Sequence, residues 1–390
     1  MPPLTLECPV HVLRSARLPA LLLLLAAIAG LVVAATPAGP AVIAARDAHL
    51  AVAGIDLSVG HWITDGLLAL FFFVVAVELR HELTVGSLRS PRAVLVPAIA
   101  ALGGVVVPIA LYLVIANGTP SASGWPIPTA TDIAFALGVL AVVGRGLPSG
   151  VRVFLLALAI LDDIVGIVLI AVVFTADIDF VALAAALALT VAFGALSLLL
   201  RGRARVPVAV LMVVVAIAVW VLVHESGVHA TIAGVLLGLA IAPGAGARAR
   251  HALEPWVNVI VLPLFAFASA LMPIPQVSPA AFAPAFWGTV LALPVGKFVG
   301  VIAFGSLAMA LFSRGSRPLA FGDLAAAGAL SGIGFTVSLL MSELAFAGAA
   351  DLRDQAILGV LGGSAISLLA AVVLVSLRAR RYRRVREAAA

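Results

Sequence analysis

Apolar segments of about 20 residues recur along almost the whole chain, and polar residues gather in the short stretches between them. A segment of this length can cross the hydrocarbon core of a bilayer as an α-helix. The pattern therefore predicts an all-α polytopic membrane protein that forms a single domain over residues 1–390. About twelve transmembrane helices are expected, at 18–35, 61–80, 93–116, 126–143, 151–174, 180–200, 206–223, 228–242, 255–272, 285–312, 321–346 (interrupted) and 355–377.

The composition favours contact with lipid over a water-excluded core. Hydrophobic residues make up 64% of the chain and charged residues 11%, whereas a soluble domain carries roughly 25% charge. The net charge of +5 raises the question of nucleic acid as a partner. The basic residues lie in loops and at the C-terminal tail, where membrane orientation explains them better. We therefore expect no nucleic-acid partner.

The arginines alternate between successive loops. Every second loop, together with both terminal segments, contains basic residues: Arg14, Arg17, Arg80, Arg89, Arg92, Arg145, Arg152, Arg201, Arg203, Arg205, Arg248, Arg250, Arg314, Arg317 and six arginines between 378 and 386. The intervening loops contain Arg46 and Arg353 as their only basic residues, among acidic ones. By the positive-inside rule both termini are cytoplasmic, and the number of spans is even.

The two ends of the chain and its longest outer loop also have expected roles. The apolar run after Arg17 continues to Ala35, so a first transmembrane helix is favoured over a cleaved signal peptide. Cys8 is the only cysteine, which excludes an internal disulfide. The outer loop 36–60 alternates around Gly54, which predicts a small hairpin resting on another surface, such as a second subunit; an ordinary loop is the alternative. The basic tail 378–390 is expected to end at the cytoplasmic headgroups.

Two adjacent carboxylates lie at the centre of the expected span 151–174. Asp162 and Asp163 are the only charged residues in FLLALAILDDIVGIVLIAVVF, and a carboxylate at mid-bilayer is unfavourable by at least about 2.5–3.5 kcal/mol. The chain's one lysine, Lys297, lies near the middle of span 285–312, and lysine can lose its proton when desolvated. Lys297 and one aspartate form either a static ion pair or, as we favour, a pair that breaks as a proton and another cation exchange.

Two other spans are interrupted by polar or flexible residues. In WPIPTATDIAFALGVL, prolines precede Thr131 and Asp132, so Asp132 is expected at the end of a half-helix; a cap at the membrane surface is the alternative. In ALSGIGFTVSLLM, Gly332 and Gly334 permit unwound backbone, and close packing of small residues is the alternative.

The interrupted spans are the fourth and the eleventh, and each is followed by a long continuous one. Spans 3–5 and 10–12 would then be inverted repeats, in which broken helices at matching positions point to a transporter's midplane site. Adjacent helical residues point about 100° apart, so one aspartate of the pair can face Lys297 while the other faces the crossing. Carboxylate, hydroxyl and carbonyl oxygens suit a hard cation. Close carboxylates cannot all stay ionised, so cation and protons would compete for one site.

Residues 62–374 closely resemble the NhaA family of bacterial sodium/proton antiporters. The blocks that carry the resemblance, in order, are WITDGLLALFF, VELRHEL, GWPIPTATDIAFALGVL, ALAILDDIVGI, SGVHATIAGV, LPLFAFA, GKFVG and SGIGFTVS. The resemblance implies a twelve-helix bacterial inner-membrane protein in which helices 4 and 11 are broken and cross, and NhaA is among the known examples of that arrangement.

The resemblance also implies roles for the intramembrane residues. Asp163 resembles the principal sodium or lithium ligand, and Asp162 the residue paired with Lys297 in proton exchange. Asp132 and Thr131 resemble the charge-balancing and polar groups of the crossing. The implied activity is electrogenic exchange that uses the proton gradient to expel sodium, by alternating access, without a cofactor or enzymatic step. Membrane lipid and a second copy in a homodimer are the expected partners.

The family also has a pH-sensing cluster at its cytoplasmic funnel. The matching residues here are Glu78, Glu82, His229 and Glu254. Arg250, Glu254 and His81 depart from the family's pattern, so the pH set-point does not follow from the resemblance. Each of these charges could also be an ordinary helix-end or packing residue. Asp65 in WITDG is expected to be a charge or cap at a helix N-terminus.

Two rival functions have specific requirements. A sodium-coupled solute symporter on a similar crossed-helix fold is the main alternative, and it would need a pocket for an organic solute. Few aromatics and no further convergent polar set argue against it. An intramembrane aspartyl protease would need a facing aspartate dyad, which the adjacent Asp162 and Asp163 cannot form.

Overall fold

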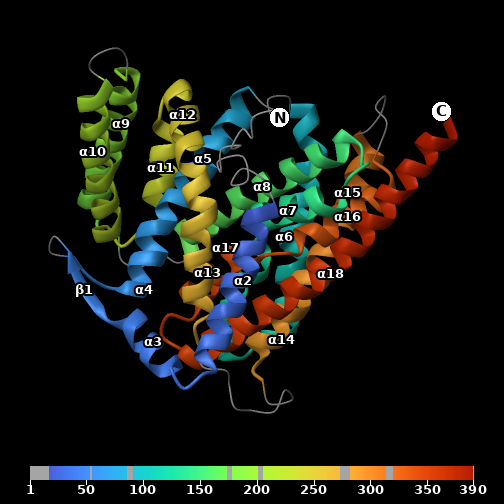
Figure 1. The fold of residues 1–390 in the computed structure, drawn as a ribbon, viewed down its shortest axis with the longest axis horizontal. Coiled ribbons are helices and arrows are strands. Elements are labelled where there is room, and N and C mark those ends of the chain that lie inside the picture. Colours follow the sequence, from blue (N-terminus) through green and yellow to red (C-terminus); the bar gives the residue numbers. More distant parts are fainter. Residues whose placement is uncertain are drawn as a thin grey trace, which may run out of the picture.

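The computed structural model describes residues 17–52, 55–85, 91–173, 178–200, 205–272, 282–312 and 319–389. These residues are almost entirely helical, as predicted, with one small sheet at the edge of the molecule (Figure 1). Several residues used in the sequence analysis lie outside the described ranges: Cys8, Arg14, Gly54, Arg89, Arg201, Arg203, Arg314 and Arg317.

The described helices follow the predicted spans in order. Their bounds, with η marking 3-10 or π turns, are α2 Arg17–Ala34, α3 Gly39–Asp47, α4 Val59–His61, η1 Trp62–Leu67, α5 Leu68–Thr84, α6 Pro91–Ala116, η3 Pro120–Gly124, η4 Ile127–Thr129, α7 Ile133–Val143, α8 Ser149–Val173, α9 Phe180–Leu198, α10 Arg205–Glu225, α11 Ile232–Ala240, α12 Pro243–Trp256, η6 Val257–Val261, α13 Leu262–Ala270, α14 Pro284–Leu291, η8 Ala292–Gly296, α15 Lys297–Phe312, α16 Phe321–Ser331, α17 Phe335–Ala345 and α18 Ala350–Ala389.

Eight helices of the described chain are long and apolar enough to cross a membrane. The count rises to ten if two bent pairs are single spans: α2 with α3, bent by 113°, and α16 with α17, bent by 45°. The predicted count of twelve is not reached because two predicted spans contain only short helices. Span 126–143 has an 11-residue helix after 3-10 turns, and span 228–242 has a nine-residue helix.

Three long helices contain a widened π turn. The turns η6 and η8 are accompanied by prolines, at Pro255, Pro263 and Pro294. Proline has no N–H to donate, and its ring crowds the preceding turn, so the helix widens locally without ending. Helix α12 begins well before the predicted span 255–272, and the segment RARHALEPW is helical.

The predicted hairpin in the loop 36–60 is present. Strand β1 (His49–Val52) pairs antiparallel with β2 (Ile55–Ser58), with His49 opposite Ser58. Trp62 of the same chain contacts it, since its Nε1 donates a 3.0 Å hydrogen bond to the carbonyl of Leu50.

Burial distinguishes the centre of the molecule from its periphery. In α16 and α17 nearly every side chain is buried, whereas α9 and α10, at the left of Figure 1, bury only a few of theirs. Exposed apolar side chains on peripheral helices are expected to face lipid. The broken pair α16–α17 is therefore the core around which the other helices pack.

Close packing of α15 on α6 places Lys297 beside α8. A Cβ on Gly300 would lie 2.1 Å from the carbonyl oxygen of Gly103, so only glycine permits this approach of the two backbones. Helix α6 also packs on α8. The three helices bring Lys297 and Asp162 to the same depth.

Candidate functional site

A fully buried ion pair joins α8 to α15. Nζ of Lys297 lies 2.8 Å from Oδ2 of Asp162, and neither side chain is exposed. Removing either charge alone would leave the other uncompensated in a medium that solvates it poorly. This contact confirms that the lysine and one carboxylate of span 5 are partners.

Thr131 completes a three-residue cluster with this ion pair. Its Oγ1 lies 2.7 Å from Oδ2 of Asp162 and 2.8 Å from the carbonyl oxygen of Ser331, and it accepts a 3.1 Å hydrogen bond from Lys297. The hydroxyl has one hydrogen for two acceptors. Thr131 thus links the ion pair to the end of α16.

Asp132 caps one half-helix and binds the start of another. Its Oδ1 accepts from the N–H of Phe135 in α7 at 2.9 Å. Its Oδ2 accepts from the N–H and the hydroxyl of Thr336 in α17, at 3.2 and 2.8 Å. Asp132 is therefore at a half-helix end, as predicted, but it is 3% exposed and lies inside the protein, not at the membrane surface.

The two interrupted segments meet directly through their backbones. The N–H of Asp132 donates to the carbonyl of Ile333 at 2.6 Å, inside the break between α16 and α17. In the other segment, Pro126 and Pro128 lie in or next to 3-10 turns, so its first half is not an α-helix as expected for span 126–143.

Gly332 and Gly334 are needed at this crossing for space. A Cβ on Gly332 would lie 2.5 Å from Ser367 Oγ, and one on Gly334 would lie 2.7 Å from Leu293 Cδ2 and 3.0 Å from the carbonyl of Ala130. Neither glycine has a positive φ. Both readings of the sequence therefore apply: the helix breaks here, and the glycines allow close packing.

Of the four predicted cation ligands, the structure brings Asp162, Asp132 and Thr131 to one crossing. Asp163 follows Asp162 in α8, and its side chain lies outside the described part of the structure. Among the described residues, no three His, Cys, Asp or Glu side chains gather closely enough to hold a metal ion. The role of Asp163 as the principal ligand stays a prediction.

One oxygen of the ion pair has a neighbour that the sequence analysis missed. Within the described residues, Oδ1 of Asp162 is buried without a hydrogen-bond partner. A Cβ on Gly104 of α6 would lie 4.0 Å from it and 3.7 Å from Lys297 Cδ. The adjacent glycines 103 and 104 were the available signal, because paired small residues in a span indicate a close helix contact.

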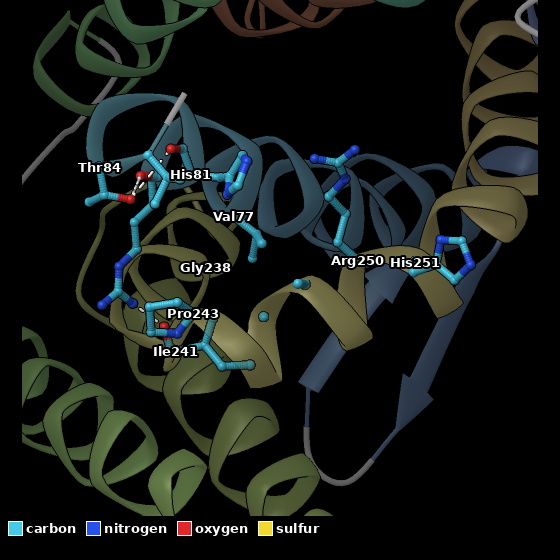
Figure 2. Close-up of a pocket in the computed structure, with 12 residues that line it drawn as sticks. Val77, His81, Thr84, Gly238, Ile241, Pro243, Arg250 and His251 are labelled. Carbon is cyan, nitrogen blue, oxygen red and sulfur yellow. Dashed lines mark hydrogen bonds between the residues drawn. The ribbon is translucent and has the colours of Figure 1, made fainter. Parts of the chain in front are cut away.

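The structure brings together two of the predicted pH-sensing residues. Arg250 Nη1 lies 3.6 Å from Glu78 Oε1, and its Nε lies 3.5 Å from Glu254 Oε2. Arg250, which departs from the family pattern, therefore lies between two acids. Beside it a pocket of about 260 Å³ opens between α5, α11 and α12. Arg80 is among its lining residues, and Figure 2 shows His81 and His251 there as well.

His229 lies apart from that cluster. Its Nε2 is 3.5 Å from Asp65 Oδ1, and its Nδ1 is 2.7 Å from Thr231 Oγ1. Asp65 precedes Glu78 by 13 residues of continuous helix, roughly 20 Å at 1.5 Å per residue. His229 therefore lies away from Glu78, and its part in pH sensing stays a prediction. Asp65 is in the first turn of η1, as predicted, but it pairs with His229 and Thr64 and caps no helix.

Comparison with known proteins gives consistent matches over most of the chain. Residues 10–375 match a family model described as Na+/H+ antiporter 1. The chain is 57% identical to the Na(+)/H(+) antiporter NhaA 2 of Clavibacter michiganensis over 384 residues, which cover 97% of this chain and 94% of the relative.

More distant relatives carry the same name. The Na(+)/H(+) antiporter NhaA of Tropheryma whipplei (strain Twist) is 43% identical over 316 residues, 80% of this chain and 81% of that protein. The Na(+)/H(+) antiporter NhaA 3 of Streptomyces coelicolor is 42% identical over 393 residues, 95% of this chain and 80% of that protein. The two interrupted segments that meet beside a buried ion pair agree with these matches. The chain belongs to the Na+/H+ antiporter 1 family, whose named relatives are NhaA antiporters.

Proposed function

We propose that the protein is a sodium/proton antiporter that expels sodium, or lithium, in exchange for protons. The observation that supports this most strongly is the buried cluster of Asp162, Lys297 and Thr131 at the contact between two interrupted segments. Ionisable groups at membrane depth mark ion and proton pathways. The names of the relatives agree with this assignment.

In the proposed mechanism, cation and protons occupy the same site alternately. Asp163 is the principal ligand of the cation, with oxygen atoms of Asp162, Asp132 and Thr131 available nearby. A proton that neutralises Asp162 weakens its attraction to Lys297, and a bound cation competes with that proton for the carboxylates. Exchange follows because both cannot be held together.

Further properties belong to the same proposal. The cycle moves more protons than sodium ions, so it is electrogenic, and it proceeds by alternating access around a fixed site. The protein lies in the bacterial inner membrane as a homodimer, with both termini and the arginine-rich loops in the cytoplasm. It contacts membrane lipid, needs no cofactor, and catalyses no covalent chemistry.

Proton flux into proteoliposomes tests this function. Vesicles loaded with sodium and diluted into sodium-free buffer should acidify inside as sodium leaves, with no organic solute present. Repeating the measurement against sodium concentration at several pH values should show that protons compete with sodium. A potassium gradient with valinomycin should change the rate if the cycle carries net charge.

The same experiment separates antiport from solute symport. A sodium-coupled symporter would show no sodium-driven acidification until its solute is added. Acidification that depends on an added solute would therefore contradict the proposal.

A further inference from the structure

A second buried carboxylate lies at the far end of α16 from the crossing. Asp323, in the first turn of α16, is 2% exposed. Arg378 Nε donates to its Oδ1 at 2.9 Å, and the hydroxyl of Tyr382 donates to its Oδ2 at 2.6 Å. Arg378 also lies over the Tyr382 ring, 5.1 Å from its centroid. These charge-assisted bonds fix α16 to the last part of α18.

The same part of α18 reaches the other broken segment. Gly146 follows α7, and with a φ of +108° it is in a conformation that favours glycine. A Cβ there would lie 3.0 Å from Arg383 Cγ and 3.4 Å from the carbonyl of Ala379. One turn and a half of α18, residues 378–383, thus contacts the start of α16 and the connection that directly follows α7.

Each of those two half-helices carries a residue of the crossing at its opposite end. Helix α7 is capped by Asp132, and α16 ends at Ser331, whose carbonyl lies 2.8 Å from Thr131 Oγ1. Both helices have 11 residues, which corresponds to roughly 16 Å at 1.5 Å per residue. A short helix moves nearly as one body, so an anchor at one end fixes the position of the other.

We propose that residues 378–383 of α18 form a bracket that positions both half-helices, with Asp323, Arg378 and Tyr382 as its positioning residues. The bracket acts through α7 and α16 on the geometry of the cation site, and none of its side chains touches the cation. This inference rests on the proposed function. It assigns a part in transport to Asp323, Arg378 and Tyr382, which lie at the end of α16 that is far from the crossing.

Sodium dependence of exchange in proteoliposomes tests the bracket. Asp323→Asn and Arg378→Gln should each raise the half-saturating sodium concentration by roughly two- to thirtyfold, the usual range of remote coupling through packed elements. Tyr382→Phe keeps the ring and removes only the hydroxyl, so it should shift the same quantity less. The matched control is Arg384→Gln, an exposed arginine on the same stretch of helix, which should behave as wild type.

The double variant Asp323→Arg/Arg378→Asp adds a rescue experiment. Restoring an ion pair of reversed polarity should bring the half-saturating concentration back towards the wild-type value. A purely structural role would lower the yield of folded protein and the maximal rate while leaving half-saturation unchanged, and that result in all three single variants would overturn the proposal. If the charge variants do not fold, Tyr382→Phe still tests the proposal, because it keeps the ring and removes only the hydroxyl. Absence of exchange in the wild type would instead overturn the antiporter function itself.

Discussion

At the scale of single residues, Lys297 and Asp162 depend on one another because neither meets water. Replacing Lys297 with Ala should lower the free energy of unfolding by about 3–5 kcal/mol, since it leaves a buried carboxylate uncompensated. Unfolding in detergent, followed by fluorescence or circular dichroism, measures the change. A variant as stable as wild type would mean that the pair contributes nothing.

The double variant Lys297→Met/Asp162→Asn is the informative control for that measurement. It removes both charges and keeps similar volumes, so most of the lost stability should return. Stability without exchange in this variant would separate the structural role of the ion pair from its role in transport.

Asp163 is expected to matter for transport more than for stability. Asp163→Asn should abolish sodium-dependent proton movement in proteoliposomes, because the cation loses its principal charged ligand. Asp351→Asn, which changes an exposed acid in the first turn of α18, should exchange normally. Normal exchange by Asp163→Asn would contradict the assignment of the cation site.

The partnership of Lys297 with an aspartate could be predicted because charges in lipid need partners. The glycine pair 103–104 indicated a close helix contact, but not that Gly104 faces the Asp162 oxygen that accepts no hydrogen bond within the described residues. That position depends on how α6 rotates against α8 and α15. Asp65 and His229 show the same limit. Their residue types were informative, but their pairing across 164 positions follows from packing alone.

At the scale of elements, the crossing depends on glycines that leave room for neighbouring backbone. Gly334→Ala would place a Cβ 3.0 Å from the carbonyl of Ala130 and against Leu293. Overpacking of this kind typically lowers stability by about 1–3 kcal/mol, and here we expect slower exchange as well. Gly150→Ala is the matched control, because a Cβ there meets no atom within 4 Å.

Sequence reasoning located both interruptions but not their form. Prolines and glycines mark where a helix cannot continue, so the breaks near 128 and 333 were predictable. Whether the chain then forms 3-10 turns, as at η3 and η4, depends on what packs around it. The widened turns at η6 and η8 were not predicted either, although prolines near them were visible.

At the scale of the whole molecule, the distribution of arginines predicts one face towards the cytoplasm. In a Cys8→Ala background, Arg384→Cys should be protected from a membrane-impermeant thiol reagent in right-side-out vesicles. Asp56→Cys, in the hairpin, should react. If Arg384→Cys reacts and Asp56→Cys is protected, the orientation in the membrane is the reverse of the predicted one. If both react, the loops do not alternate between the two sides as the arginines predict.

The order of the spans could be read from the sequence because hydropathy acts locally along the chain. The bracket between α16 and α18 could not, because Asp323 and Arg378 are 55 positions apart and both resemble ordinary charges beside a cytoplasmic loop. Only the folded arrangement shows that these two charges are directed at one another and not at solvent.

The binding of two helix N-termini by Asp132 sets the electrical balance of the crossing. Each N-terminus carries about half a positive charge, so α7 and α17 together offset the one negative charge of this carboxylate. Lys297 offsets Asp162 in the same way. With the charges of Asp132 and Asp162 offset, the remaining charge among these three aspartates is the single negative charge of Asp163. One monovalent cation neutralises it, whereas a divalent cation would leave a surplus charge in a medium of low polarity. We therefore expect the cation site to reject calcium and magnesium because of their charge. Ionic radius can then decide only between sodium and lithium.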